Sequence, residues 1–301
     1  QEALTGKTCD RNIHMAYPMQ EWLYLKLYGS SHREEELIAC HLKDFCEEIK
    51  QTYGVDSFFM RYADPKPHVR LRFYGESEKL YAILPVVMEW SRGLLEAEVI
   101  GDLAIVPYER EVERYGGIGL IKKAEQLFFA DSTVVAQIIQ NRRFHTVGMD
   151  LEEIAASSVL FYVTDFYETL PEQLAFLEAN YHDTIYEKEW KARKQRMIAQ
   201  LDIETDWTGF CQSEDGSWLY PLWENRKEAV ICYREAMKGQ VSDLEMNDIV
   251  ASVLHLHCNR LLGTNRDLEQ KVMTLAESVL YAKKYVLGKK GGYGTGKCEA
   301  S

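Results

Sequence analysis

Cationic side chains occupy alternate positions in the stretch His68-Val-Arg-Leu-Arg-Phe73. In an extended chain successive side chains point to opposite faces, so His68, Arg70 and Arg72 share one face and the apolar residues between them share the other. Guanidinium groups bind carboxylates with paired hydrogen bonds, and a strand needs no such row of charge to form. The row therefore predicts contact with an anion, with an acidic neighbour or with water, and the strand alone leaves these three open.

A second cluster is Tyr108-Glu-Arg-Glu-Val-Glu-Arg-Tyr-Gly-Gly117. In a helix Arg110 and Arg114 would lie one turn apart on one face. The glutamates between them offer a simpler interpretation, a solvated run of charges that neutralise one another. Gly116 and Gly117 permit a tight turn, which would aim Arg114 and Tyr115 from a shaped loop.

A third cluster lies in the helical stretch Ser252-Val-Leu-His-Leu-His-Cys-Asn-Arg-Leu-Leu-Gly263. Helical spacing places His255 and Asn259 on one face and His257 about 160° away around the axis. Two histidines at this spacing are a poor metal pair, and no cysteine or glutamate completes a zinc set. His255 is then either a proton-transfer group or a hydrogen-bonded core residue, and Asn259 could orient it in both cases.

Composition limits the class of protein. The chain has 301 residues, a formal net charge of −12 and seven cysteines without a close pair. An acidic chain is a poor partner for a nucleic acid or an anionic membrane, and an odd, scattered cysteine set indicates reduced thiols in the cytoplasm. No stretch reads as a membrane span or signal peptide, and no phosphate loop or dinucleotide fingerprint is present, so we expect no cofactor.

The elements that must position these clusters begin with a βαββαβ order. Alternating or turn-bounded apolar patterns predict strands at 22–28, on both sides of the turn within 58–73, and at 102–107. Amphipathic patterns predict helices over 31–53 and 77–97 between them. This order is the ferredoxin-like arrangement, an antiparallel sheet with helices on one face and the other face open for a site. We therefore predict an α+β fold.

The sequence pattern of the remaining chain predicts helices almost to its end. Asp131 and Ser132 are good N-cap residues and divide one helical stretch into two, over 118–130 and 133–141. Further helices are expected over 150–167, 171–201, 224–238, 242–262 and 265–286, with a loop over 205–221. We expect an arm over 1–19, one composite domain over 20–287 with a βαββαβ part (20–107) and a helical part (108–287), and a disordered tail over 288–301.

Taken together, the clusters resemble a known family. The motifs that carry the resemblance are Trp22-Leu-Tyr-Leu-Lys-Leu-Tyr28, Arg61-Tyr-Ala-Asp-Pro65, His68-Val-Arg-Leu-Arg72, Tyr108-Glu-Arg-Glu111, Arg114-Tyr-Gly-Gly117, Ala124-Glu125, Asp131-Ser132 and His255-x-x-x-Asn-Arg-Leu-x-Gly263. In this order they are similar to the glutamate-elimination domain of class I lanthipeptide dehydratases and to its stand-alone relatives in thiopeptide pathways. The resemblance spans nearly the whole chain, and it leaves open a split subunit or a piece of a longer protein.

The resemblance implies a lyase that removes glutamate from glutamylated Ser or Thr of a precursor peptide, leaving dehydroalanine or dehydrobutyrine. Its catalytic residues would be Arg70, Arg72, Arg110, Arg114 and His255, and its substrate-binding residues Arg61, His68, Tyr115 and Asn259. No metal or cofactor is implied. Whether His255 accepts or donates the proton stays open.

The implied partners are the precursor peptide and a separate tRNA-dependent glutamylating enzyme, with no direct contact to nucleic acid or membrane; a homodimer is also open. Two alternatives remain. One is the pyridine-forming cyclase of thiopeptide pathways, and the other is a non-catalytic subunit that binds the precursor on the open sheet face.

Overall fold

The computed structural model describes residues 14–181, 184–201 and 207–292. The described chain divides into two compact units: unit 1 lies within residues 14–144 and 235–264, and unit 2 lies within residues 145–234 and 265–292. Each contributes its own core. The expected single composite domain over 20–287 stays a prediction, and most of the expected arm lies outside the described residues.

Unit 1 contains the predicted antiparallel sheet. Its strands are β2 (Trp22–Tyr28), β3 (Asp56–Tyr62), β4 (His68–Tyr74) and β5 (Asp102–Ile105), in the spatial order β3-β4-β2-β5. This is the ferredoxin-like order, so the α+β prediction is confirmed. A small ladder pairs β1 (Met15–Ala16) with β6 (Tyr108–Glu109), directly after β5.

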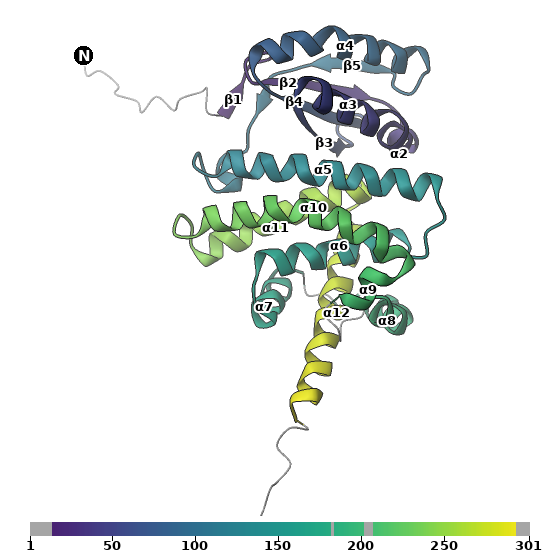
Figure 1. Ribbon diagram of the computed structural model, residues 1–301, viewed down its shortest axis with the longest axis vertical. Helices are drawn as coiled ribbons and strands as arrows, with labels where there is room; N and C mark the ends of the chain where they lie inside the picture. Colours follow the sequence, from purple (N-terminus) through teal and green to yellow (C-terminus); the bar gives the residue numbers. More distant parts are fainter. Residues whose placement is uncertain (1–13, 182–183, 202–206, 293–301) are drawn as a thin grey trace, which may run out of the picture. The chain divides into compact units, whose positions relative to one another are not determined.

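Helices cover the apolar face of the sheet. The segment after β2 begins as a short η1 turn (Ser31–Arg33), passes through α2 (Glu34–Glu36) and η2 (Leu37–Leu42), and ends as α3 (Lys43–Tyr53). Gly54 stops α3 in the left-handed region at φ +64°, where a glycine has no Cβ to clash. The second helix is α4 (Ser77–Glu96), and Phe45 of α3 stacks on its Trp90 at 4.3 Å between ring centres. Figure 1 shows α3 and α4 beside the strands.

Helix α5 (Ile121–Phe144) is continuous, so the predicted break at Asp131 and Ser132 is wrong. Both side chains are buried and have partners outside their own helix. Ser132 Oγ accepts a hydrogen bond from the Phe59 amide (3.2 Å), and the Asp131 carboxylate accepts bonds from Arg260 and His257. Residues of these types usually bind the free backbone amides at the start of a helix, but here they bind groups of other segments.

Side chains of α5 and of α11 (Asp243–Leu262) complete the outer edge of β3. The Asn259 carboxamide accepts from the Arg61 amide (3.0 Å) and donates to the Arg61 carbonyl (2.9 Å), as a neighbouring strand would. Arg260 Nε donates to the Phe59 carbonyl at 2.9 Å. The carboxylate of Asp131 lies 2.9 Å from both Arg260 Nη1 and His257 Nδ1, and these three side chains are at most 1% exposed. Residues of the third sequence cluster, 252–263, thus hold the edge of β3 in place.

Unit 2 is helical. Its elements are α6 (Leu151–Phe166), α7 (Leu170–Tyr181), α8 (Glu187–Leu201), α9 (Thr208–Gln212), most of α10 (Glu214–Met237), and α12 (Arg266–Gly292). Asp150 caps α6 in a capping box with Glu153, which agrees with the helix expected from residue 150.

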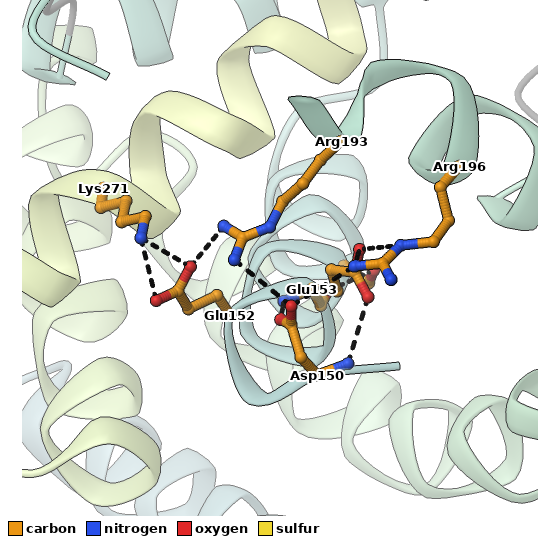
Figure 2. A network of polar contacts seen from close by, with 7 residues as sticks. Asp150, Glu152, Glu153, Arg193, Arg196 and Lys271 are labelled. Carbon is orange, nitrogen blue, oxygen red and sulfur yellow. Dashed lines mark hydrogen bonds and ion pairs between the residues drawn. The ribbon is translucent and has the colours of Figure 1, made fainter. Parts of the chain in front are cut away.

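An ionic network joins the start of α6 to α8 and α12 (Figure 2). Arg196 Nε donates to Glu153 at 2.7 Å, Arg193 contacts Asp150 at 3.3 Å, and Lys271 lies 2.9 Å from Glu152. Acidic side chains at the N-terminus of a helix interact favourably with the helix dipole. Here each of them also contacts a cationic side chain of another helix. The network holds three helices of unit 2 at one point.

Three expectations for the helical chain need correction. The helix expected over 171–201 is two helices, α7 and α8, and the loop expected over 205–221 includes α9 and the start of α10, which contains Pro221. The disordered tail was expected from residue 288, but α12 continues to Gly292, since each added helical residue gains a backbone hydrogen bond. Residues 293–301 lie outside the described chain.

Two further findings concern cysteines and membrane spans in the described residues. Cys40, Cys46, Cys211 and Cys232 are free thiols. Within the described ranges no helix combines the length and the apolar character that crossing a bilayer requires.

Replacing Asn259 with Ala should destabilise unit 1. The change leaves the buried Arg61 amide and carbonyl without partners, and each unsatisfied group costs on the order of 1–3 kcal/mol. We expect the free energy of unfolding in urea to fall by about 2–4 kcal/mol. Asn141→Ala, a half-buried position on α5, is the control and should change it by less than about 1 kcal/mol. Equal stability of both variants would contradict the edge-closing role of Asn259.

Candidate active site

A cavity of about 660 Å³ lies against the face of the sheet that carries the cations. Its walls come from β2, β3 and β4, from residues 106–115, from His14, and from one side chain each of α5 and α11. The residues that line it are His14, Tyr24, Lys26, Phe58, Met60, Tyr62, Arg70, Arg72, Val106, Pro107, Tyr108, Glu109, Arg110, Glu111, Glu113, Tyr115, Phe128 and Leu256. All of them belong to unit 1.

Strand pairing explains why these residues meet. Lys26 of β2 is directly opposite Arg70 of β4, and Tyr24 is opposite Arg72. Paired residues on neighbouring strands point to the same face, so alternate positions of the strands converge on the cavity. Arg70 and Arg72 share one face, as expected, but that face is only partly open, because Phe128 and Phe129 of α5 cover its Phe58 and Trp22 end.

Arg72 is buried among aromatic rings. Its guanidinium carbon lies 4.3 Å from the ring centre of Tyr24, 4.4 Å from Tyr108 and 5.0 Å from Phe58. Only 5% of the residue is exposed, and no carboxylate of the described chain forms an ion pair with it. Ring faces attract a cation but do not neutralise it. A buried charge of this kind creates a strong preference for an anion in the cavity.

Arg70 is held in place by Tyr62 and His68. Its guanidinium lies 3.3 Å from the centre of the Tyr62 ring, and its Nε donates to His68 Nε2 at 3.2 Å. His68 is buried and does not line the cavity, so its role is to orient Arg70. Burial, followed by the charge of Arg70, lowers the pKa of His68. The imidazole is therefore neutral and accepts the hydrogen bond.

Arg110 lines the cavity but already has a counter-ion. Its Nε and Nη2 donate to the two oxygens of Glu125 on α5, at 2.8 and 2.5 Å, and both side chains are nearly buried. Burial raises the pKa of Glu125, and the hydrogen bonds from Arg110 offset only part of that effect. The pair keeps Arg110 less available to a second carboxylate than Arg70 or Arg72.

Arg114 and Tyr115 differ in position. They lie in the turn η3 (Glu113–Tyr115), where Arg114 is outside the cavity lining, 3.3 Å from Glu111 and 3.2 Å from Ser252 Oγ of α11. Tyr115 lines the cavity with its ring against Phe128, and burial raises its pKa. Gly116 follows at φ +88°, and a Cβ there would lie 2.5 Å from Leu120, so this position requires glycine.

The histidines of α11 have distinct surroundings. His257 is fully buried against Asp131, whereas His255 is half-buried, one turn beyond Ser252, the residue that Arg114 contacts. His255 is not among the residues that line the cavity. Asn259 and Arg61 also lie outside the lining: Asn259 binds the β3 backbone, and Arg61 is buried, with Glu34 as the charge that affects its pKa most. Direct substrate binding by these two residues is therefore not supported by their positions.

Sequence reasoning missed two contributors. Lys26 is the one charge in an apolar strand, and strand alternation would have placed it on the same face as Tyr24. It has no counter-ion within the described residues. Glu125 was noted only as part of a motif, because its pairing with Arg110 depends on how α5 packs. Among the residues described, no three or more His, Cys, Asp or Glu side chains group to hold a metal.

Comparison with known proteins places the chain in a family. A family model described as lantibiotic biosynthesis dehydratase, C-terminal, matches residues 22–280. The chain belongs to this family. It is 40% identical over 284 residues to the subtilin biosynthesis protein SpaB of Bacillus subtilis, covering 94% of this chain and 27% of SpaB. The chain thus spans about a quarter of the length of that relative.

Solved structures share the fold. The tRNA-dependent lantibiotic dehydratase MibB from Microbispora sp. 107891 matches with a TM-score of 0.81 and 24% identity, over 91% of this chain and 29% of MibB. The pyridine synthase TbtD from thiomuracin biosynthesis matches with a TM-score of 0.63 and 15% identity, over 89% of this chain and all of TbtD. At these identities the two likenesses establish the architecture alone.

The pKa of His68 should be below that of a free imidazole, about 6.5. Burial favours the neutral ring of His68. The contribution of this residue to the free energy of unfolding is therefore present above the ordinary pKa, and it is lost as pH falls through the lowered pKa of the folded state. NMR titration, assigned with a His68→Gln variant, should show a midpoint below 6.5. Arg70→Ala should raise that midpoint only in part, since burial is the larger cause. A midpoint at or above 6.5 would show that His68 does not accept from Arg70.

Proposed function

We propose that this chain is the elimination module of a lantibiotic-type dehydratase, a lyase that expels glutamate from glutamylated Ser or Thr of a precursor peptide. The observation that carries the proposal is a cavity in which Lys26, Arg70 and Arg72 converge without a carboxylate partner in the described chain. Family membership supports the proposal, because the matching family model describes a lantibiotic biosynthesis dehydratase.

The proposed reaction is a β-elimination. A base removes the Cα proton of the modified residue, its electron pair forms the Cα–Cβ double bond, and the Cβ–O bond breaks to release glutamate. The leaving group gains a carboxylate charge, and cations already fixed near its position stabilise that charge without reorganisation. Arg72 and Arg70 are assigned to this role, with Lys26 beside them.

Proton transfer is assigned to His255. Imidazole has a suitable pKa near neutral pH, and a positioned general base commonly contributes about a hundred- to ten-thousand-fold in rate. The contacts of Arg114 with Ser252 link η3 to the turn of α11 that precedes His255. In this proposal Arg110 shapes the cavity wall through Glu125, and Arg114 orients the side of the site near α11.

The proposal also defines what the chain needs from elsewhere. The glutamyl ester must be formed first, by a tRNA-dependent glutamylating enzyme or domain, and the precursor peptide must carry it here. Elimination from an ester that is already activated needs neither ATP nor a metal. A pyridine-forming cyclase would act on peptides that are already dehydrated, so release of glutamic acid distinguishes the two activities.

Arg72→Ala should reduce glutamate release strongly. Purified chain, treated with EDTA, is incubated with a synthetic peptide that carries a glutamyl-serine ester, and mass spectrometry follows loss of glutamic acid. Loss of one preorganised charge donor typically costs about a hundred- to a thousand-fold in kcat. Arg72→Lys should recover part of the rate because it keeps the charge but not the planar guanidinium.

The control for Arg72 is Arg92→Ala, an exposed cation on α4 that pairs with glutamates of its own helix. It should retain the wild-type rate. An intact wild-type chain that dehydrates nothing, or that requires a metal, would overturn the proposed function.

His255 and His257 should separate chemistry from stability. His255→Ala should lower elimination by about a hundred-fold or more while the unfolding midpoint changes little, since the residue is half-buried. His257→Ala removes a buried hydrogen-bond donor of Asp131 and should lower the free energy of unfolding by about 2–4 kcal/mol. Where it is folded, this variant should retain elimination. The opposite pattern would remove His255 from the proposed mechanism.

A further inference from the structure

The two edges of the sheet in unit 1 differ. The outer edge of β3 is completed by Ser132, Asn259 and Arg260, which bind the backbone of Phe59 and Arg61. No strand of the described chain pairs with the outer side of β5, the other edge. An unpaired strand edge is a template for an extended peptide.

Particular backbone groups of β5 point outward. The Val106 amide donates to the Tyr24 carbonyl at 3.1 Å, and the ladder pairs Ala104 with Lys26. Because backbone groups alternate in an antiparallel ladder, the amide and carbonyl of Ile105 and the carbonyl of Leu103 face away from β2. The Leu103 amide donates to Asp102 Oδ1 at 2.7 Å, so it is not used in a bond between strands. Ile105 is 41% exposed.

This open edge leads directly to the cavity. Val106, Pro107 and Tyr108 follow β5 in the chain and line the cavity. Ala104 is paired with Lys26 and shares its face of the sheet, and its side chain is small. Pro107 has no amide to offer, which is typical of an edge position.

We propose that the precursor peptide adds to the outer edge of β5 as a further strand, with its glutamylated side chain crossing above Ala104 to reach Lys26 and Arg70. This inference rests on the proposed function for the identity of the peptide. The backbone groups of Leu103 and Ile105 then bind any sequence in extended form, while the cations select the residue that carries glutamate.

The dimensions agree with this path. Neighbouring strands lie about 4.8 Å apart, so an added strand would be roughly 10 Å from β2. A glutamylated serine has seven bonds from its Cα to the far carboxylate carbon, whichever glutamate carboxyl forms the ester. At about 1.5 Å per bond and tetrahedral angles it spans roughly 8–9 Å. The Lys26 side chain extends over the remaining distance.

Ile105→Pro tests the proposal, because it removes the outward amide without removing a ladder hydrogen bond to β2. The matched control, Ile105→Ala, keeps that amide and removes only the side chain. Two substrates are compared: a glutamylated serine with five residues on each side, and glutamyl-N-acetylserine methylamide, which is too short to pair as a strand.

We expect Ile105→Pro to raise KM for the long peptide about tenfold, because the variant loses a hydrogen bond to the added strand and its ring clashes with that strand. The kcat for the long peptide and the activity on the short substrate should not change. Ile105→Ala should stay within about twofold of wild type on both substrates. Ala104→Tyr, which fills the crossing path, should raise KM for the long peptide as well. Activity on the short substrate confirms that each variant is folded.

An unchanged KM of Ile105→Pro for the long peptide, in a chain active on both substrates, would overturn the strand proposal and leave the proposed function intact. If the wild-type chain releases glutamate from neither substrate, the proposed function fails. Hydrogen exchange then decides the strand separately. Protection of the Ile105 amide by the same peptide without glutamate would support strand addition, and no protection would overturn it.

Discussion

The outer edge of β3 is the constraint on which unit 1 depends. A strand buried at its edge must have partners for its backbone groups, and here side chains of two helices provide them. The Asp131 carboxylate fixes the donors by binding both His257 and Arg260. With β3 held in register, its alternate residues, Tyr62 among them, reach the cavity and hold the cations of β4.

The cations of the cavity are held in position more by packing against aromatic rings than by ion pairs with carboxylates. Aromatic rings surround Arg72, and the Tyr62 ring lies against Arg70, so their positions are fixed while their charge remains available to an anion. Arg110 shows the alternative, because a bidentate contact with Glu125 fixes it and neutralises it at once. The same residue type thus serves as wall or as binding group, according to whether the partner is a ring or a carboxylate.

The sequence could predict what depends on short-range pattern. Strand alternation placed Arg70 and Arg72 on one face, and the helical pattern from residue 150 predicted the start of α6. It could not show that Asp131 binds side chains of a helix more than a hundred residues away, since the same residue type is equally suited to cap a helix. The roles of Asn259 and Glu125 were hidden for the same reason: each is decided by a tertiary partner.

The double use of β4 has an evolutionary consequence. Its two faces serve different ends, the core through Val69, Leu71 and Phe73 and the cavity through Arg70 and Arg72. If one residue were inserted or deleted within the strand, every residue after that point would move to the opposite face of the sheet. Arginine side chains would then point into the core, and the cavity would lose its cations. A change in length is therefore expected to be tolerated in the turn at residues 63–67, whereas within the strand only a substitution preserves both faces.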